Sequence, residues 1–157
     1  MVTTASPHDV TLTLTRHFYA PVQKVFRAWT DPKALMKWFA PSDSHTTPHA
    51  EVDLRTGGRY RIEIRSPDGT VSAVSGLYRE IRPAKRLVFT WAWATGGVVP
   101  PDVAEHETLV TVQFHDRDRV TDVIVTHEHF PTPDERHAHH ERWTSLLDRL
   151  PHALPHH

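Results

Sequence analysis

Two short helices joined at a proline corner are predicted by the stretch APVQKVFRAWTDP, which covers residues 20–32. Pro21 suits the first turn of a helix, where its missing N–H costs nothing, and apolar residues follow at helical spacing up to Trp29. Asp31 can cap a second helix that begins at Pro32. The inner face of this second helix is expected to carry three bulky apolar side chains: Leu35, Trp38 and Phe39.

Strands dominate the chain after these helices, because the hydrophobic period there becomes two. One strand of the same kind precedes the helices, over residues 10–18. Glycine, proline and aspartate interrupt the pattern where hairpin turns are expected, and Gly76 indicates a bulge that bends the sheet. Residues 42–49 are expected to form a loop. The strands expected after the helices are 50–54, 59–65, 71–81, 86–93, 108–115 and 120–129.

A long amphipathic helix is predicted near the end of the chain. Thr132 can cap it, Pro133 suits its first position, and Glu135 lies three residues after the cap. Pro151 ends the pattern. The apolar stripe of this helix has helical spacing and consists of His139, Trp143, Leu146, Leu147 and Leu150.

This order of elements predicts an α+β helix-grip architecture. A strongly bent antiparallel sheet of about six or seven strands would bury the stripe of the long C-terminal helix best, and the two short helices after the first strand would plug one end. A chain of 157 residues favours a single domain over residues 1–157, with a core at about 10–150.

Composition excludes several classes of function. The formal charge of −1, with arginines scattered among acids, argues against a nucleic-acid partner. The absence of cysteine excludes disulfides and thiolate chemistry. No apolar run is long enough for a membrane span and no secretory signal is visible, so we expect a cytoplasmic protein without a membrane partner.

Several motifs occur together in a fixed order between about Thr11 and Leu150. They are the opening over residues 20–32, Asp53…Gly57-Gly58…Tyr60, Gly76-x-Tyr78-x-Glu80-Ile81-x-Pro83, the strand Arg86-Leu87-Val88-Phe89-Thr90-Trp91, and His139-x-x-x-Trp143. By the order and spacing of these motifs, the chain resembles the homologues of the activator of heat-shock-protein-90 ATPase, within the START/birch-pollen-allergen (SRPBCC) helix-grip superfamily.

This resemblance implies a cavity between the sheet and the final helix, and it implies no shared catalytic motif. Two positions depart from the family's pattern. Arg142 stands where the family usually has Gly before the Trp. The last strand carries His127-Glu128-His129, which is richer in imidazole than the usual single His.

Alternation places His127 and His129 on one strand face, which the family's geometry makes concave. The aromatic side chains on inward positions favour an apolar pocket with a few polar groups. The candidate ligand-binding residues are Trp38, Phe39, Tyr60, Tyr78, Phe89, Trp91, Trp93, Glu107, His127, His129, His139 and Trp143.

We therefore expect the protein to bind a hydrophobic or aromatic small molecule in this cavity. The alternatives are a cyclase- or hydrolase-like enzyme that uses a cavity histidine as general base, and a co-chaperone-type partner with an exposed apolar patch on the outer sheet face. The sequence leaves a homodimer open. A metal shared by His127 and His129 would need a third ligand from His139, Glu107 or His106. Hydrogen-bonded imidazoles without a metal are favoured, and no cofactor is predicted.

Overall fold

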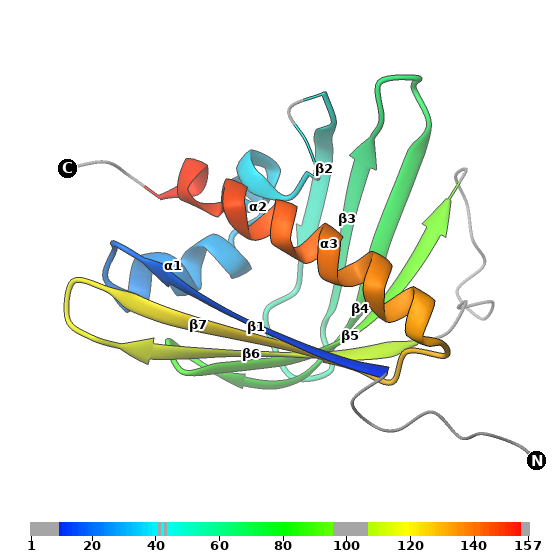
Figure 1. Ribbon diagram of the computed structural model, residues 1–157. Coiled ribbons are helices and arrows are strands. Elements are labelled where there is room, and N and C mark those ends of the chain that lie inside the picture. Colours follow the sequence, from blue (N-terminus) through cyan, green and yellow to red (C-terminus); the bar gives the residue numbers. More distant parts are fainter. Residues whose placement is uncertain (1–9, 41, 43, 96–106, 155–157) are drawn as a thin grey trace, which may run out of the picture.

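The computed structural model describes residues 10–40, 42, 44–95 and 107–154. In this part of the chain a seven-stranded sheet curls around one long helix, α3 (Pro133–Arg149), as Figure 1 shows. All neighbouring strands are antiparallel, which confirms the predicted α+β helix-grip fold. In order across the sheet, the strands are β1 (Thr11–Phe18), β7 (Thr121–Glu128), β6 (Thr108–Asp116), β5 (Arg86–Thr95), β4 (Val71–Arg82), β3 (Arg59–Arg65) and β2 (Thr46–Val52).

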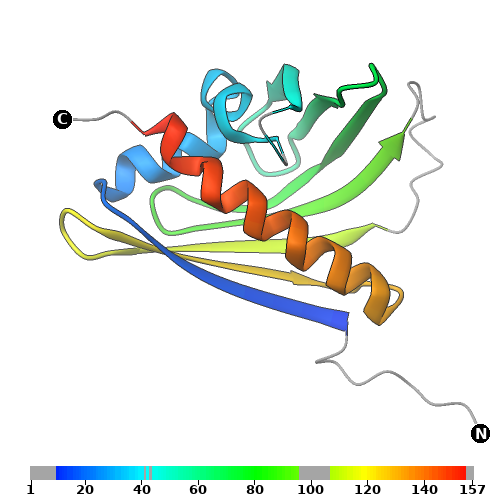
Figure 2. The same cartoon turned by 45° about the horizontal axis from the view of Figure 1, so that its top comes forward.

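The two short helices are α1 (Val22–Thr30) and α2 (Pro32–Trp38), and they lie at one end of the sheet (Figure 2). The Asp31 carboxylate between them accepts a hydrogen bond from the backbone N–H of Lys33 at 3.0 Å, so the predicted cap is confirmed. The indole N–H of Trp38 donates to the carbonyl oxygen of Ala28 at 2.8 Å, which ties the second helix to the first.

The long helix begins as predicted. The hydroxyl of Thr132 accepts a hydrogen bond from the backbone N–H of Glu135 at 3.1 Å, and Pro133 occupies the first helical position. A 3₁₀ turn, η2 (Leu150–Ala153), follows the helix and lies near α2. The predicted stripe faces the concave side of the sheet, with buried side chains at His139, Trp143, Leu146, Leu147 and Leu150.

The prediction for the region before β3 is wrong in part, because β2 begins at Thr46 inside the expected loop and ends at Val52. Pro48 can lie within this strand because β2 is the edge of the sheet, where a missing N–H breaks no ladder. The register with β3 shifts between Thr46 and His49, around the proline.

Gly76 does not mark the bulge itself. The register of β4 against β5 shifts between Tyr78 and Glu80, two residues further along. A Cβ atom at Gly76 would collide with the backbone carbonyl of Thr90 on β5. Glycine is therefore needed for the close approach of two strands, while the shift beside it accompanies the bend of the sheet.

Candidate functional site

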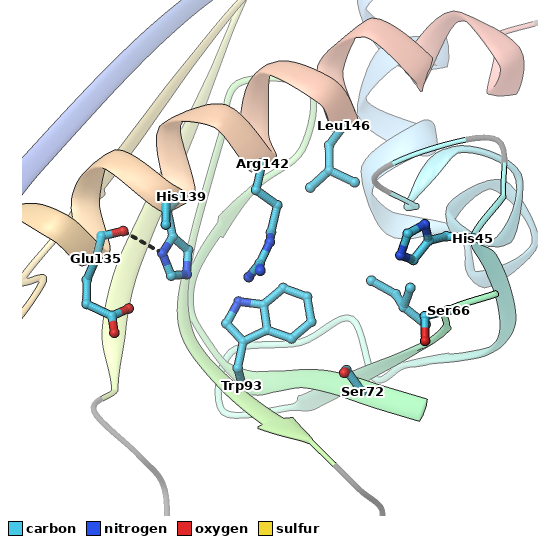
Figure 3. A pocket seen from close by; sticks show the side chains of 10 residues that line it. His45, Ser66, Ser72, Trp93, Glu135, His139, Arg142 and Leu146 are labelled. Atoms are coloured by element: carbon cyan, nitrogen blue, oxygen red, sulfur yellow. Dashed lines mark hydrogen bonds between the residues drawn. The ribbon is translucent and has the colours of Figure 1, made fainter. Parts of the chain in front are cut away.

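A pocket of about 300 Å³ lies between α3 and the part of the sheet formed by β3, β4 and β5 (Figure 3). The helix contributes Glu135, Ala138, His139, Arg142 and Leu146, and the opposite wall consists of His45, Ile64, Ser66, Ser72 and Trp93. The inward positions of β3 and β4 pair across the strands, with Ile64 opposite Ser72. The period-two pattern of both strands thus directs these two side chains toward α3.

Arg142 projects from α3 into this pocket and lies over the ring of Trp93 (Figure 3). The guanidinium carbon is 4.6 Å from the indole centroid, in the range of a cation–π interaction. Burial lowers the pKa of Arg142 from its usual value, but an arginine side chain stays charged at neutral pH. Among the described residues, Arg142 forms no ion pair with a carboxylate.

His139 forms the neighbouring part of the helix wall, with 8% of its surface exposed. Its Nδ1 lies 2.8 Å from the backbone carbonyl oxygen of Glu135. A carbonyl oxygen can only accept, so Nδ1 carries the proton and Nε2 keeps a lone pair in the neutral ring. Burial lowers the pKa of His139, which favours this neutral form at pH 7. Figure 3 shows that Nε2 is on the side of the ring that faces Trp93 and Arg142.

His127 lies deeper and is fully buried. The indole N–H of Trp143 donates to its Nδ1 at 3.0 Å, so this nitrogen is unprotonated. Nε2 therefore carries the proton and donates to the hydroxyl of Thr108 at 2.6 Å, and this hydroxyl donates to the carbonyl oxygen of Trp91 at 3.1 Å. Burial holds the pKa of His127 well below its usual value. Both ring nitrogens are thus engaged, and the imidazole is neutral.

Packed aromatic rings fill the space between the sheet and the buried side of α3 around Trp143. Trp143 stacks on Trp29 with ring centroids 5.8 Å apart, and its ring is 5.0 Å from that of Trp91. Trp38 packs edge-on against Trp29 at 5.0 Å. A void of only about 20 Å³ remains beside these rings; its walls are Trp29, Leu35, Phe39, Tyr60, Ile62, Tyr78, Phe89 and Trp91.

The structure separates the twelve predicted site residues into four groups. Trp93 and His139 line the 300 Å³ pocket, and together with Trp91 they line a second pocket of about 70 Å³. Phe39, Tyr60, Tyr78, Phe89 and Trp91 surround the small interior void. Trp38, His127 and Trp143 are fully buried core residues. Glu107 and His129 belong to the outer side of the sheet, in a shallow depression with Val88, Thr90 and Leu109.

The expectation that His129 shares the concave face with His127 is wrong. The strand β7 ends at Glu128, and His129 has a φ of +73°, so the alternation of side chains stops before it. Glu107 is exposed and forms an ion pair with Arg79, with 3.6 Å between the charged groups. Neither side chain is directed toward α3.

Eight wall residues of the pocket were not among the predicted site residues: His45, Ile64, Ser66, Ser72, Glu135, Ala138, Arg142 and Leu146. Ile64 shares the inward face of β3 with Tyr60 and Ile62, so strict extension of the period-two pattern would have included it. Arg142 carried a signal as well, because it departs from the family's usual glycine. No local pattern marks His45, which precedes β2 at the pocket rim.

Metal ligation has no support among the residues that the structure describes, since no three His, Asp or Glu side chains there are close enough to share an ion. His106, one of the candidate third ligands, lies outside this set. Nor does any helix within the described ranges have the length and apolar character needed to cross a bilayer.

Several solved structures have the same fold. A protein from Nitrosomonas europaea is 26% identical, with a TM-score of 0.75 over 92% of this chain and 94% of its own. A protein from Chromobacterium violaceum is 27% identical, with a TM-score of 0.75 over 93% of this chain and 99% of its own. The AHSA1-like protein from Aeromonas hydrophila is 25% identical, with a TM-score of 0.72 over 94% and 96% of the two chains.

A comparison with curated proteins gives no match. A family profile matches residues 19–155, which include both short helices, strands β2 to β7 and α3. This match confirms the resemblance that the sequence motifs indicated. The chain therefore belongs to the family described as Activator of Hsp90 ATPase homolog 1-like protein.

Proposed function

We propose that this protein binds a small apolar or aromatic molecule in the pocket between α3 and strands β3 to β5. The observation that carries the proposal is the open volume of about 300 Å³ under α3, which is at the lower end of the usual range for small-molecule sites. Its walls combine the apolar side chains of Ile64, Trp93 and Leu146 with a few polar groups, as is typical of such sites.

The proposed binding position differs from the one that the sequence favoured. The expected cavity included Trp38, His127 and Trp143 among its walls, and the packed rings leave almost no room at these residues. Trp93 and His139 keep their place in the proposed site, because they border the open volume. A ligand in this position would contact the side of α3 that carries Glu135, Arg142 and Leu146.

The two alternative functions have less support. A general base needs a free ring nitrogen, and both nitrogens of His127 are engaged. His139 has a free Nε2 but no hydrogen bond with a carboxylate among the described residues. A co-chaperone-type partner would need an exposed apolar patch. Among the described residues the exposed large apolar side chains are Tyr19, Met36 and Leu54, which lie in separate segments outside the strands and suggest no such patch.

Titration with N-phenyl-1-naphthylamine, a neutral aromatic probe whose fluorescence rises in apolar surroundings, tests the proposal. Ser72 faces the pocket and Ser75 faces the opposite side of β4, so they offer matched substitutions. We expect saturable binding to the native protein, its loss in Ser72→Trp, where an indole fills the pocket, and its retention in Ser75→Trp. Absence of binding to the native protein, or equal binding to both variants, would contradict the proposal.

A further inference from the structure

Arg142 gives the pocket a chemical preference. We infer that the ligand combines a flat apolar ring system with a carboxylate, and that the guanidinium of Arg142 binds this carboxylate. The inference rests on the proposed function, because it names the class of molecule for the same pocket.

The hydrogen-bonding capacity of Arg142 is available to a ligand. The guanidinium carbon lies 4.6 Å from the centroid of the Trp93 ring, and an attraction to the ring face uses none of the strong acceptors that its five N–H groups can reach. Other arginines near α3 are engaged: Arg136 donates to the carbonyl oxygen of Thr11 at 2.7 Å, and Arg16 pairs with Asp148. Arg142, in contrast, has no hydrogen bond or ion pair with any other described residue.

The position of this charge favours an anion. Arg142 is half-buried against an indole ring, and a partly desolvated charge is costly until it is paired and hydrogen-bonded. A planar carboxylate matches the fork of a guanidinium and can accept two parallel hydrogen bonds. Burial lowers the pKa of Arg142, and the carboxylate of Glu135 acts in the opposite direction.

The other walls limit where the carboxylate can bind. Neutral His139 presents the lone pair of Nε2, which repels a carboxylate and suits a donor group of the ligand. The carboxylate of Glu135 lies on the first turn of α3 and disfavours an anion near that end. A bound carboxylate is therefore directed to Arg142, and the ring of the ligand is directed to the apolar surface of Ile64 and Leu146.

A matched pair of compounds tests this preference. 1-Naphthylacetate and 1-naphthylacetamide have nearly the same shape, but only the first carries a charge. We expect isothermal titration calorimetry to give the acetate about 10- to 100-fold higher affinity for the native protein, as hydrogen bonds to a charged group predict. In Arg142→Gln the ratio of the two affinities should fall to about one, and in Arg142→Lys it should be intermediate.

A control separates the position of the charge from the net charge of the protein. Arg119→Gln removes one exposed positive charge from the turn between β6 and β7, at the far end of the sheet, and should leave the ratio unchanged. Thermal unfolding of each variant reports whether the fold is intact.

The outcomes distinguish the two proposals. Equal affinity of the native protein for both compounds overturns the carboxylate preference and leaves the proposed function standing. A preference that persists in Arg142→Gln overturns the role of Arg142. Failure of both compounds to bind the native protein, together with failure of the neutral probe, overturns the proposed function and this inference with it.

Discussion

His127 and His139 lie with their ring centroids 5.2 Å apart, and their hydrogen bonds give them different roles. His127 links β7 to α3 through the indole N–H of Trp143 and to β6 through Thr108. Its neutral form is required by this arrangement, because protonated Nδ1 could not accept from the indole. His139 has one nitrogen turned to its own helix and one to the pocket.

Acid should therefore weaken the fold through His127. Its pKa is well below the usual value in the folded protein, so only the unfolded chain takes up a proton as the pH falls below about 6.5. The contribution of His127 to the free energy of unfolding is complete above that pH. It is lost at about 1.4 kcal/mol per pH unit between the unfolded and the folded pKa.

Urea denaturation of the native protein and of His127→Gln between pH 5 and 8 measures this contribution, within the range where histidines titrate. Glutamine keeps an acceptor but does not titrate, so its curve should be shallower below pH 6.5. His139 is present in both proteins and its lowered pKa adds the same slope to both curves. Identical slopes would show that His127 takes up its proton at the same pH in the folded and the unfolded protein, which would contradict a buried neutral imidazole.

At the scale of elements, the pairing of β4 with β5 determines how the sheet bends. Leu77 donates its backbone N–H to the hydroxyl of Thr90 at 2.8 Å, and Tyr60 donates to the carbonyl oxygen of the same threonine at 2.5 Å. Gly76 lies against this carbonyl with no room for a Cβ atom. These contacts bring β3, β4 and β5 together beside the small interior void.

We expect Gly76→Ala to destabilise the protein by about 1–3 kcal/mol, because the added methyl group would force the two backbones apart. The sign of this change in the free energy of unfolding is informative. A Gly→Ala substitution at an unstrained position stabilises a protein by about 0.4–1 kcal/mol, because it reduces the conformational freedom of the unfolded chain. Chemical denaturation gives the difference in the free energy of unfolding. Ser75→Ala, on the neighbouring residue of β4, serves as the control and should have a small effect. Unchanged or increased stability of Gly76→Ala would contradict the close approach.

At the scale of the whole molecule, the grip of the sheet on α3 has a packed side and an open side. Trp143 on the helix meets the tryptophans of α1 and β5, whereas Glu135, Arg142 and Leu146 border the pocket. Ligand binding and folding should therefore be coupled, because the pocket exists only when β3, β4 and α3 are in place.

A ligand that binds only the folded protein raises the free energy of unfolding by about 2.7 kcal/mol at 100 times its Kd. For a protein of this size we expect 1-naphthylacetate at that concentration to raise Tm by about 5–10 °C. Differential scanning fluorimetry measures the shift, and Ser72→Trp should show none. An equal shift in this variant would place the compound elsewhere on the protein.

Sequence patterns alone determined the elements of this protein, because local chemistry specifies them. Asp31 and Thr132 cap their helices through side-chain oxygens that reach only a few residues along the chain. The inward faces of β5 and α3 follow directly from periods of two and 3.6 residues. The fold class followed from their order. The predicted strand boundaries differ most at β2, an edge strand that tolerates Pro48, and by one or two residues at other strands, as where His129 leaves β7 and where β5 continues to Thr95.

Only the tertiary structure decided where open space remains. Periodicity tells which side chains face inward, but it does not tell whether rings from different elements meet each other or leave a gap. Trp143 meets Trp29 and Trp91 and fills the centre, whereas Arg142, one residue earlier, enters a space bounded by Trp93 on β5. That difference arises because packing depends on the distance between α3 and the bent sheet. Contacts between residues that are far apart in the sequence determine this distance.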